Sequence, residues 1–245
     1  MYQHIAHFYD LFDHDDPEPL RHAALVLRHT SSDADVLDVG AGTGRAAMFL
    51  AEAGLRVWCI EPSAAMRMIL LGRVADDTTH DALLTVLPGD AQTLDLGRQF
   101  DAAAACHLLY LLDDAALDQS LERLRAHVRA GGRLIGDFAL ASGRTAHART
   151  LASTRRIGEV DYRKYTLSQP VTSALWHVTW QFEAWRGERL IEQHEETFDV
   201  RVRDGAACRQ LLHAHGFAVQ AEFGDYAGTP WRDDARAGRY VFVAS

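Results

Sequence analysis

Three glycines at alternate positions follow directly after a short apolar run, and this junction constrains the fold more than any other stretch. The apolar run spans residues 35–39, the glycines are Gly40, Gly42 and Gly44, and residues 46–53 then have a helical pattern. Glycine lets the backbone approach a ligand more closely than a Cβ atom would allow. A strand, a glycine turn and a helix in this order predict a nucleotide-binding corner of an open α/β sheet.

The spacing of the glycines argues against two common kinds of nucleotide site. The dinucleotide fingerprint G-x-G-x-x-G needs its third glycine at the position that Arg45 holds, which disfavours a nicotinamide oxidoreductase. A phosphate-binding P-loop needs Lys-Ser or Lys-Thr after the glycines, and neither follows them here. The corner therefore predicts a nucleotide-like ligand of another kind.

The composition favours a small molecule as the partner. The 245 residues, 48% of them hydrophobic, predict a single domain over residues 1–245 with a full core. A net charge of −9 disfavours binding to nucleic acid. No apolar run reaches the roughly 18 residues of a membrane helix, and the first residues lack the pattern of a signal peptide. The three cysteines are widely spaced and odd in number, which predicts buried thiols in a cytoplasmic protein.

Hydrophobic segments and helical patterns alternate through most of the chain. We expect strands at residues 35–39, 55–61, 83–87, 100–107, 133–138, 217–223 and 240–243, with helices at 18–28, 46–53, 113–129 and 206–215. Because the first five strands are continuously hydrophobic, they predict a parallel sheet covered on both faces. Residues 141–165 are polar, basic and poorly periodic, and we expect a connection with some helix there.

The hydrophobic period changes to two in residues 176–184, where Trp176 and Trp180 alternate with polar side chains. Residues 190–202 predict the returning strand of an antiparallel hairpin. This hairpin, within an insert over residues 145–203, is expected to contribute to a substrate pocket. Which of its faces looks into the cleft stays open, and packing of the tryptophans in the core is the simpler interpretation. The hairpin is also a candidate contact for a homodimer.

The first thirty residues are rich in aromatic and histidine side chains, and they predict a helical cover over a ligand cleft. His4, His7 and His14 raise the question of a metal site. Structural zinc sites use closely spaced pairs of Cys and His, and no second pair lies at a suitable spacing. We therefore expect no metal.

Acidic residues follow the second and third predicted strands. Glu61 ends the second strand, where a carboxylate can accept hydrogen bonds from both ribose hydroxyls. The alternative for Glu61 is an acid that stabilises a helix N-terminus. Asp90 follows the third strand, where it is a candidate acceptor for an adenine amine or, in Pro88-Gly89-Asp90, a turn residue.

Taken together, these segments resemble the class I S-adenosylmethionine-dependent methyltransferases over nearly the whole chain. Residues 38–44 resemble the family's first motif, Glu61 its ribose-binding acid and Asp90-Ala91 its adenine-contacting pair. Phe100-Asp101 and residues 131–134 resemble the openings of its fourth and fifth strands. The resemblance implies an α/β fold: a Rossmann-like, seven-stranded, mostly parallel sheet with helices on both faces and an antiparallel β insert after the fifth strand.

The resemblance also implies that S-adenosylmethionine is bound as the methyl donor and leaves as S-adenosylhomocysteine. The donor would lie against backbone of the glycine corner, with its ribose on the acid of the second strand. The expected donor-binding residues are Asp38, Gly40, Gly42, Gly44, Glu61, Pro62, Met66, Asp90, Ala91 and Cys106. A core position on a helix explains Met66 equally well.

The methyl acceptor needs groups that orient it and remove its proton. His107 is the first candidate for a general base, because it follows the fourth strand and an imidazole has an ordinary pKa near 6.5. Tyr9 and Tyr110 are candidates to orient the acceptor. The alternatives are a structural histidine at a strand end and tyrosines that only line the pocket.

An aromatic N-terminal cover combined with an antiparallel insert resembles small-molecule methyltransferases, such as sugar N,N-dimethyltransferases and glycine N-methyltransferase-like enzymes. We therefore expect in-line methyl transfer to an amine or ring nitrogen of a secondary metabolite. Two alternatives remain. One is a small-molecule O-methyltransferase, and the other is a protein that binds S-adenosylmethionine without transferring its methyl group.

Overall fold

Seven strands form a mostly parallel sheet at the centre of the molecule. The computed structural model describes residues 2–13, 16–233 and 237–245, and it orders these strands β3-β2-β1-β4-β5-β11-β10. β11 alone runs antiparallel to its neighbours. The bounds are β1 (Asp35–Val39), β2 (Arg56–Glu61), β3 (Leu84–Pro88), β4 (Phe100–Ala105), β5 (Val128–Leu140), β10 (Val219–Phe223) and β11 (Arg239–Ala244). The predicted α/β class and mostly parallel sheet are confirmed, and these seven strands are part of a continuous sheet of eleven.

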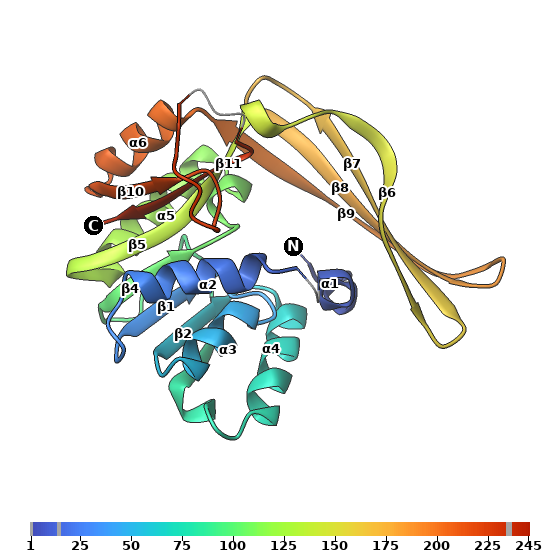
Figure 1. Ribbon diagram of the computed structural model, residues 1–245, viewed down its shortest axis with the longest axis horizontal. Helices are drawn as coiled ribbons and strands as arrows, with labels where there is room; N and C mark the ends of the chain where they lie inside the picture. The colour runs from blue at the N-terminus through green and yellow to red at the C-terminus, as the bar shows by residue number, and fades with distance from the viewer. Residues whose placement is uncertain (1, 14–15, 234–236) are drawn as a thin grey trace.

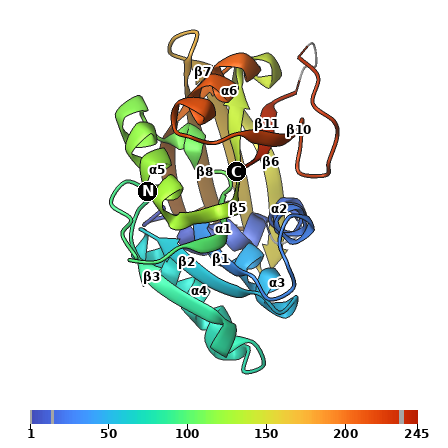
Figure 2. The same ribbon diagram turned by 90° about the vertical axis from the view of Figure 1, so that its left-hand side faces the viewer.

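Helices cover both faces of this sheet because its strands are apolar on both sides. α2 (Glu18–Arg28), α3 (Arg45–Glu52) and α4 (Ala64–Asp76) share one hydrophobic core with Val36. α5 (Asp114–His127) and α6 (Gly205–Ala214) share the other with Leu37, the next residue of the same strand. Figure 2 shows α5 to one side of the sheet and α2 and α3 to the other. The 3₁₀ helices are Asp81–Leu83, Leu109–Leu111 and Ala141–Gly143.

Four long antiparallel strands form an arm after β5. They are β6 (His147–Ile157), β7 (Val160–Pro170), β8 (Leu175–Arg186) and β9 (Arg189–Arg203). The arm joins the main sheet where Ala139 and Leu140 of β5 pair with Val202 and Arg203 of β9. In Figure 1 it extends away from the α/β body. The predicted antiparallel insert is therefore confirmed in a larger form, with four strands instead of two.

The expectation of a connection with some helix over residues 141–165 is wrong beyond the 3₁₀ helix Ala141–Gly143, because β6 and half of β7 form there. Almost every residue of β6 is exposed. A strand without a buried face has no reason to alternate apolar and polar side chains, so the period-two pattern is missing.

The N-terminal helix α1 (Ala6–Asp13) packs on the arm instead of on the main sheet (Figure 1). Phe8 stacks on Phe182 of β8, with ring centroids 5.2 Å apart and an angle of 7° between the rings. Ile5 and Phe198 complete this buried cluster. His14, one of the histidines considered for a metal site, lies outside the described residues.

Two further expectations concern thiols and membrane spans. Cys59, Cys106 and Cys208 are free and buried, as predicted. Among the helices of the described residues, none combines the length and the apolar character needed to cross a bilayer.

Candidate functional site

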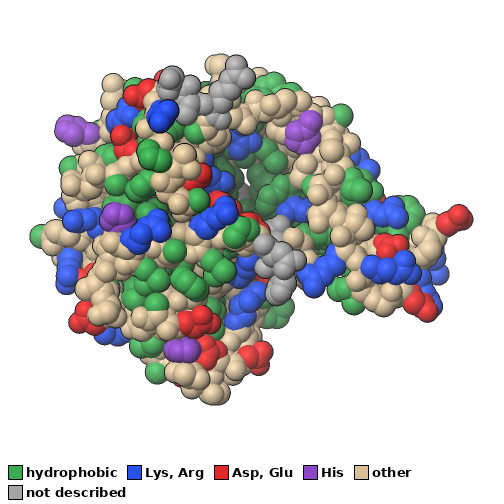
Figure 3. Space-filling model, in the orientation of Figure 1, with side chains coloured by type: hydrophobic (Ala, Val, Ile, Leu, Met, Phe, Trp, Pro, Cys, Tyr) green, Lys and Arg blue, Asp and Glu red, His purple; other side chains and the backbone are tan. Residues whose placement is uncertain are grey.

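A cavity of about 410 Å³ opens at the carboxyl ends of the central parallel strands. This is where ligands bind in open α/β sheets, because the strand order reverses between β1 and β4. The space-filling view shows a hollow between the α/β body and the arm, with hydrophobic side chains on its wall (Figure 3). The cavity wall combines residues of the glycine corner, the N-terminal segment, the loop after β4 and the arm.

The glycine corner forms one end of the cavity. Gly40 and Gly42 line it, with φ angles of +79° and +58° that favour glycine. The N–H of Gly40 donates to the carbonyl oxygen of Ile60 at 2.8 Å, which holds the corner against β2. Gly44 is not among the lining residues. A Cβ atom there would lie 2.0 Å from Leu70 Cδ1, so this glycine allows the corner to pack on α4.

Glu61 lies beside the corner and lines the cavity. Its Oε2 accepts the N–H of Gly42 at 3.0 Å and its Oε1 accepts the N–H of Ser63 at 2.8 Å. Burial raises the pKa of Glu61 above the ordinary value, and these two hydrogen bonds oppose that change. Each carboxylate oxygen can accept a second hydrogen bond, so a pair of hydroxyl groups still has acceptors here.

Asp38 lies behind this end of the cavity and is not among the lining residues. It is buried, and no described residue is a hydrogen-bond partner for its Oδ2. Burial, followed by the charge of Glu61, raises the pKa of Asp38 to about 7. A buried carboxyl group in this state is stabilised by a nearby cation or hydrogen-bond donor.

Three other predicted donor-binding residues also line the cavity: Pro62, Met66 and Cys106. Met66 lies in the first turn of α4, where the Ser63 side chain accepts its N–H. Burial raises the pKa of the Cys106 thiol well above the ordinary value, so this residue contributes a neutral, apolar surface.

The predicted adenine pair does not line the cavity. Asp90 Oδ1 accepts hydrogen bonds from the backbone N–H groups of Gln92 and Thr93 and from the Thr93 hydroxyl. This fixes the turn after β3. Ala91 is buried in the hydrophobic core. A contact of Asp90 and Ala91 with the donor therefore stays a prediction.

His107 lines the cavity on the side away from β2 and has a φ angle of +59°. Arg239 Nη1 donates to His107 Nδ1 at 2.7 Å, and Nε2 lies 3.9 Å from Glu18 Oε2. Burial lowers the pKa of His107 below 6.5. The ring is therefore neutral at neutral pH. Since a guanidinium group can only donate, this arrangement favours the tautomer with its proton on Nε2.

A buried carboxylate, Asp137 of β5, organises the surroundings of His107. It accepts the backbone N–H of His107 at 2.6 Å, Arg239 Nη1 at 2.6 Å and the Tyr226 hydroxyl at 2.8 Å. Burial works against its charge, but Arg239 and these hydrogen bonds hold the pKa of Asp137 below the ordinary value. These bonds hold His107 in its left-handed conformation at the end of β4. Our sequence analysis missed Asp137 and Arg239, although one acid inside the apolar fifth strand was a signal, because a buried charge needs partners.

Aromatic side chains form the opposite wall. Five aromatic side chains line the cavity. They are Tyr2, Tyr9 of α1, Tyr110 of the 3₁₀ helix Leu109–Leu111, Trp180 of β8 and Phe198 of β9. Trp180 packs edge-on against Phe198 with centroids 4.9 Å apart, and Tyr9 lies 6.1 Å from Trp180. Burial raises the pKa of Tyr110 to about 12. The face of β8 that carries Trp180 and Val178 therefore looks into the cavity, which answers the question left open by the sequence.

Two cations line the cavity in addition to Arg239. Lys164 Nζ lies 4.4 Å from the ring centroid of Trp180. Arg144 also lines the cavity, and its buried Nε has no hydrogen-bond partner among the described residues. Burial lowers the pKa of Arg144, so an anionic group nearby would be favourable.

The N-terminal cover is fastened to the glycine corner. Asp10 of α1 accepts the Thr43 hydroxyl at 2.7 Å and Arg73 Nη2 at 2.5 Å. Arg45 Nη2 donates to the carbonyl oxygen of Asp16 at 2.6 Å. Arg45, which occupies the position of the third glycine in a dinucleotide site, therefore helps to hold the N-terminal cover against the glycine corner.

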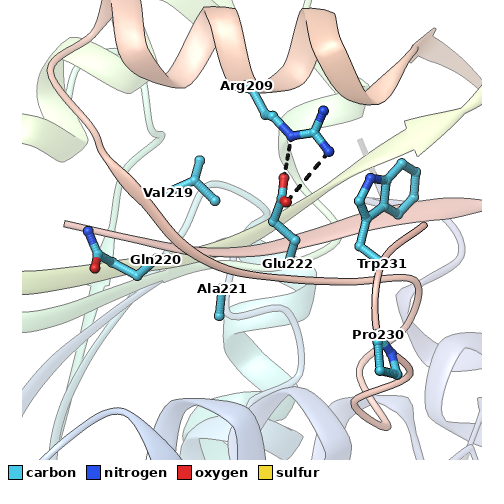
Figure 4. A pocket seen from close by; sticks show the side chains of 7 residues that line it. All are labelled: Arg209, Val219, Gln220, Ala221, Glu222, Pro230 and Trp231. Atoms are coloured by element: carbon cyan, nitrogen blue, oxygen red, sulfur yellow. Dashed lines mark hydrogen bonds and ion pairs between the residues drawn. The ribbon is translucent and has the colours of Figure 1, made fainter. Parts of the chain in front are cut away.

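A second depression lies between α6 and β10 (Figure 4). Its charged groups are already paired, because Arg209 Nε donates to Glu222 Oε1 at 2.5 Å and Arg209 Nη2 donates to Asp233 Oδ1 at 3.0 Å. None of the predicted site residues lines it. We therefore place the candidate site in the cavity at the strand ends.

Part of the chain matches a known family and a known enzyme. A family described as "Methyltransferase domain" matches residues 37–134, which span the glycine corner, Glu61 and His107. The dTDP-3-amino-3,6-dideoxy-alpha-D-glucopyranose N,N-dimethyltransferase of Streptomyces fradiae is 36% identical over 115 residues, covering 46% of this chain and 42% of that protein. The chain thus spans less than half the length of this relative.

Solved structures resemble the fold over nearly its whole length. The CcbJ methyltransferase from Streptomyces caelestis has a TM-score of 0.80 and 21% identity, with 99% of this chain and 96% of that chain covered. CalS10 from Micromonospora echinaspora, an amino pentose methyltransferase solved with S-adenosylmethionine, has a TM-score of 0.71 and 17% identity, with 93% and 90% covered. The arm and the N-terminal helix lie within the region covered by the first of these.

Proposed function

We propose that this chain is a class I S-adenosylmethionine-dependent methyltransferase and that it transfers a methyl group to an amine nitrogen of a small secondary metabolite. The observation that carries the proposal is the composition of one cavity. The glycine corner and Glu61 line the same cavity as His107 and Trp180. Donor and acceptor can therefore meet in a single enclosed space.

The glycine corner and Glu61 fit the donor. Glu61 would accept hydrogen bonds from the ribose hydroxyls, and Gly40 and Gly42 leave room for the methionine portion against the backbone. The orphaned Oδ2 of buried Asp38 would gain from the nearby ammonium group. When bound, S-adenosylmethionine supplies a methyl group that its sulfonium charge already activates.

The chain's own contribution is alignment and exclusion of water. Positioning two reactants in line can be equivalent to an effective concentration of about 10⁵ M or more. Tyr9, Tyr110 and Trp180 enclose the acceptor side, and the Asp10 contacts hold α1 over it. We propose that the two tyrosines orient the acceptor, as the sequence predicts.

His107 is our candidate for handling the acceptor's proton. Its neutral ring is suited to this, and Nε2 is the nitrogen that Arg239 leaves available. In the favoured tautomer Nε2 carries a proton, so His107 first orients the acceptor as a donor. Action as a base at Nε2 requires Arg239 to release Nδ1. Glu18, 3.9 Å from Nε2, is then placed to attract a cationic amine.

The charges of the cavity support an acceptor that carries both an amine and an anionic group. Asp16 and Glu18 act electrostatically on His107, and Arg144 and Lys164 also line the cavity. The relative from Streptomyces fradiae is named for an amino sugar linked to dTDP, which has both kinds of group. An aminated sugar nucleotide or a similar anionic amine is therefore the first acceptor class to test.

The test is incubation with S-adenosylmethionine labelled in its methyl group and panels of amines and phenols, followed by mass spectrometry of the products. We expect label on nitrogen of an anionic amine. Label on a phenolic oxygen would identify an O-methyltransferase. Tight donor binding without label in any panel member would contradict the proposal of methyl transfer, and an unchanged rate of labelling in folded His107→Ala would contradict the role of His107.

A further inference from the structure

Three side chains with metal-binding atoms converge where α1 meets the arm. His7 of α1 and Glu192 and His194 of β9 place their ligand atoms within 4.8 Å of one another. We propose that this cluster, the His7–Glu192–His194 cluster, binds a divalent transition-metal ion such as Zn²⁺ and thereby fastens α1 to the arm. In the described part of the chain, no other set of three His, Cys, Asp or Glu side chains comes together in this way.

The donor set and its spacing suit such an ion. Two imidazoles and one carboxylate are a ligand set that Zn²⁺ uses, with bonds of about 2.0–2.2 Å. Tetrahedral ligands at those bond lengths lie about 3.3–3.5 Å apart. His7 Nε2 is 3.4 Å from Glu192 Oε1, which already matches. His194 Nε2 is at hydrogen-bond distance from the same oxygen, 2.7 Å, and would need to move by about 0.6 Å.

Strand geometry prepares two of the three ligands. Glu192 and His194 are two residues apart on β9, so they project from the same face. The cross-strand partner of His194 is Phe182, on which Phe8 of α1 stacks. Because Phe8 is adjacent to His7, an apolar contact already holds the third ligand close to the strand. The ion would reinforce this contact.

Exposure makes the cluster accessible. The side chains of His7 and Glu192 are 54% and 43% exposed. An ion bound there would keep a position open to water, which is the usual arrangement for three protein ligands.

The cluster adjoins the candidate active site without belonging to it. The same face of β9 continues to Phe198 and Val200 in the cavity wall, and α1 contributes Tyr9 to that wall. Metal binding would therefore tie together two segments that enclose the acceptor. The ion would have a structural role, and no step of methyl transfer passes through it.

The test is a titration of the full-length, tag-free and chelator-treated protein with Zn²⁺ by isothermal titration calorimetry, without methyl donor or acceptor. We expect one ion per chain. His7→Ala and His194→Ala should each weaken binding at least tenfold, and Glu192→Gln, which preserves shape, should do so too. Metal should also slow proteolysis of α1 in the wild type but not in His194→Ala.

His177→Ala is the matched control. His177 lies on the same arm and pairs with a carboxylate, Asp199 at 2.8 Å, but belongs to no three-ligand group among the described residues. This variant should bind Zn²⁺ like the wild type. Absence of stoichiometric binding, or unchanged affinity in folded His7→Ala and His194→Ala, would overturn the proposal. Circular dichroism establishes that each variant is folded.

Discussion

Glu61 is the single side chain on which the proposed donor site depends most. We expect Glu61→Gln to weaken binding of S-adenosylhomocysteine about 10- to 100-fold, because a hydrogen bond to a charged group contributes about 1.5–3 kcal/mol. Calorimetric titration measures this. Glu122→Gln on the exposed side of α5 is the control and should leave the affinity unchanged. An unchanged affinity in folded Glu61→Gln would remove this residue from the donor site.

His22 gives the protein a specific dependence on pH. It is buried, its Nδ1 has no partner among the described residues, and burial followed by the charge of His107 lowers its pKa to about 3. Because the folded pKa lies below the ordinary 6.5, the unfolded chain takes up the proton first. The stability due to neutral His22 is therefore complete above pH 6.5 and is lost as the pH falls toward 3.

Replacement of His22 by leucine tests this dependence. One proton contributes a slope of about 1.4 kcal/mol per pH unit to the free energy of unfolding. Urea unfolding between pH 4.5 and 6 should show a slope reduced by about this amount in His22→Leu. The exposed His213→Leu should keep the slope of the wild type. Equal slopes in all three proteins would contradict the assignment.

The residues of the candidate site differ in how far the sequence predicted them. Gly40 and Gly42 belong to one short motif, and Glu61 ends the next predicted strand, so local patterns and their order along the chain were enough to predict them. Asp137 and Arg239 are 102 positions apart and meet only because β11 pairs with β5. No local pattern records such a pairing, and only the isolated acid in an apolar strand pointed toward it.

At the scale of elements, the arm is the part that should determine the acceptor. Trp180 of β8 lies in the cavity wall, whereas Trp185, near the end of the same strand, is not among the lining residues. For an acceptor identified by the labelling test, we expect Trp180→Ala to raise KM at least tenfold while the affinity for S-adenosylhomocysteine stays within about twofold. A tenfold rise in KM corresponds to about 1.4 kcal/mol of binding free energy for the acceptor.

Trp185→Ala is the matched control for this measurement. The Trp185 indole N–H donates to Glu183 at 2.8 Å, away from the cavity, so its removal should leave KM unchanged. A KM that responds equally to both substitutions would indicate that the arm acts through general stability. In that case the acceptor must be recognised elsewhere.

The same arm contains the strands that the sequence analysis failed to predict. Strands with a buried face, such as β1 and β8, were predicted from their hydrophobic pattern. β6 and β7 were not, because β6 is exposed nearly throughout and both strands are held by backbone hydrogen bonds to their neighbours. Backbone pairing does not depend on side-chain type, so it leaves no signal in the sequence.

At the scale of the whole molecule, the proposed donor-binding residues and the aromatic wall of the cavity come from different parts of the fold. The α/β body supplies the corner and Glu61, and the arm with α1 supplies the aromatic wall. Asp10 connects them, because α1 packs on the arm while Asp10 pairs with Thr43 and Arg73 of the body. The mostly parallel sheet was predicted from the sequence and its resemblance to a known family, but the way in which arm and body enclose one cavity required the structure.

The most direct measurement is a crystal structure with S-adenosylhomocysteine bound. The account predicts both ribose hydroxyls within hydrogen-bond distance of Glu61, the methionine portion against Gly40 and Gly42, and the sulfur facing the space between His107 and Trp180. A ligand bound outside this cavity, or a sulfur directed away from His107 and the aromatic wall, would contradict it.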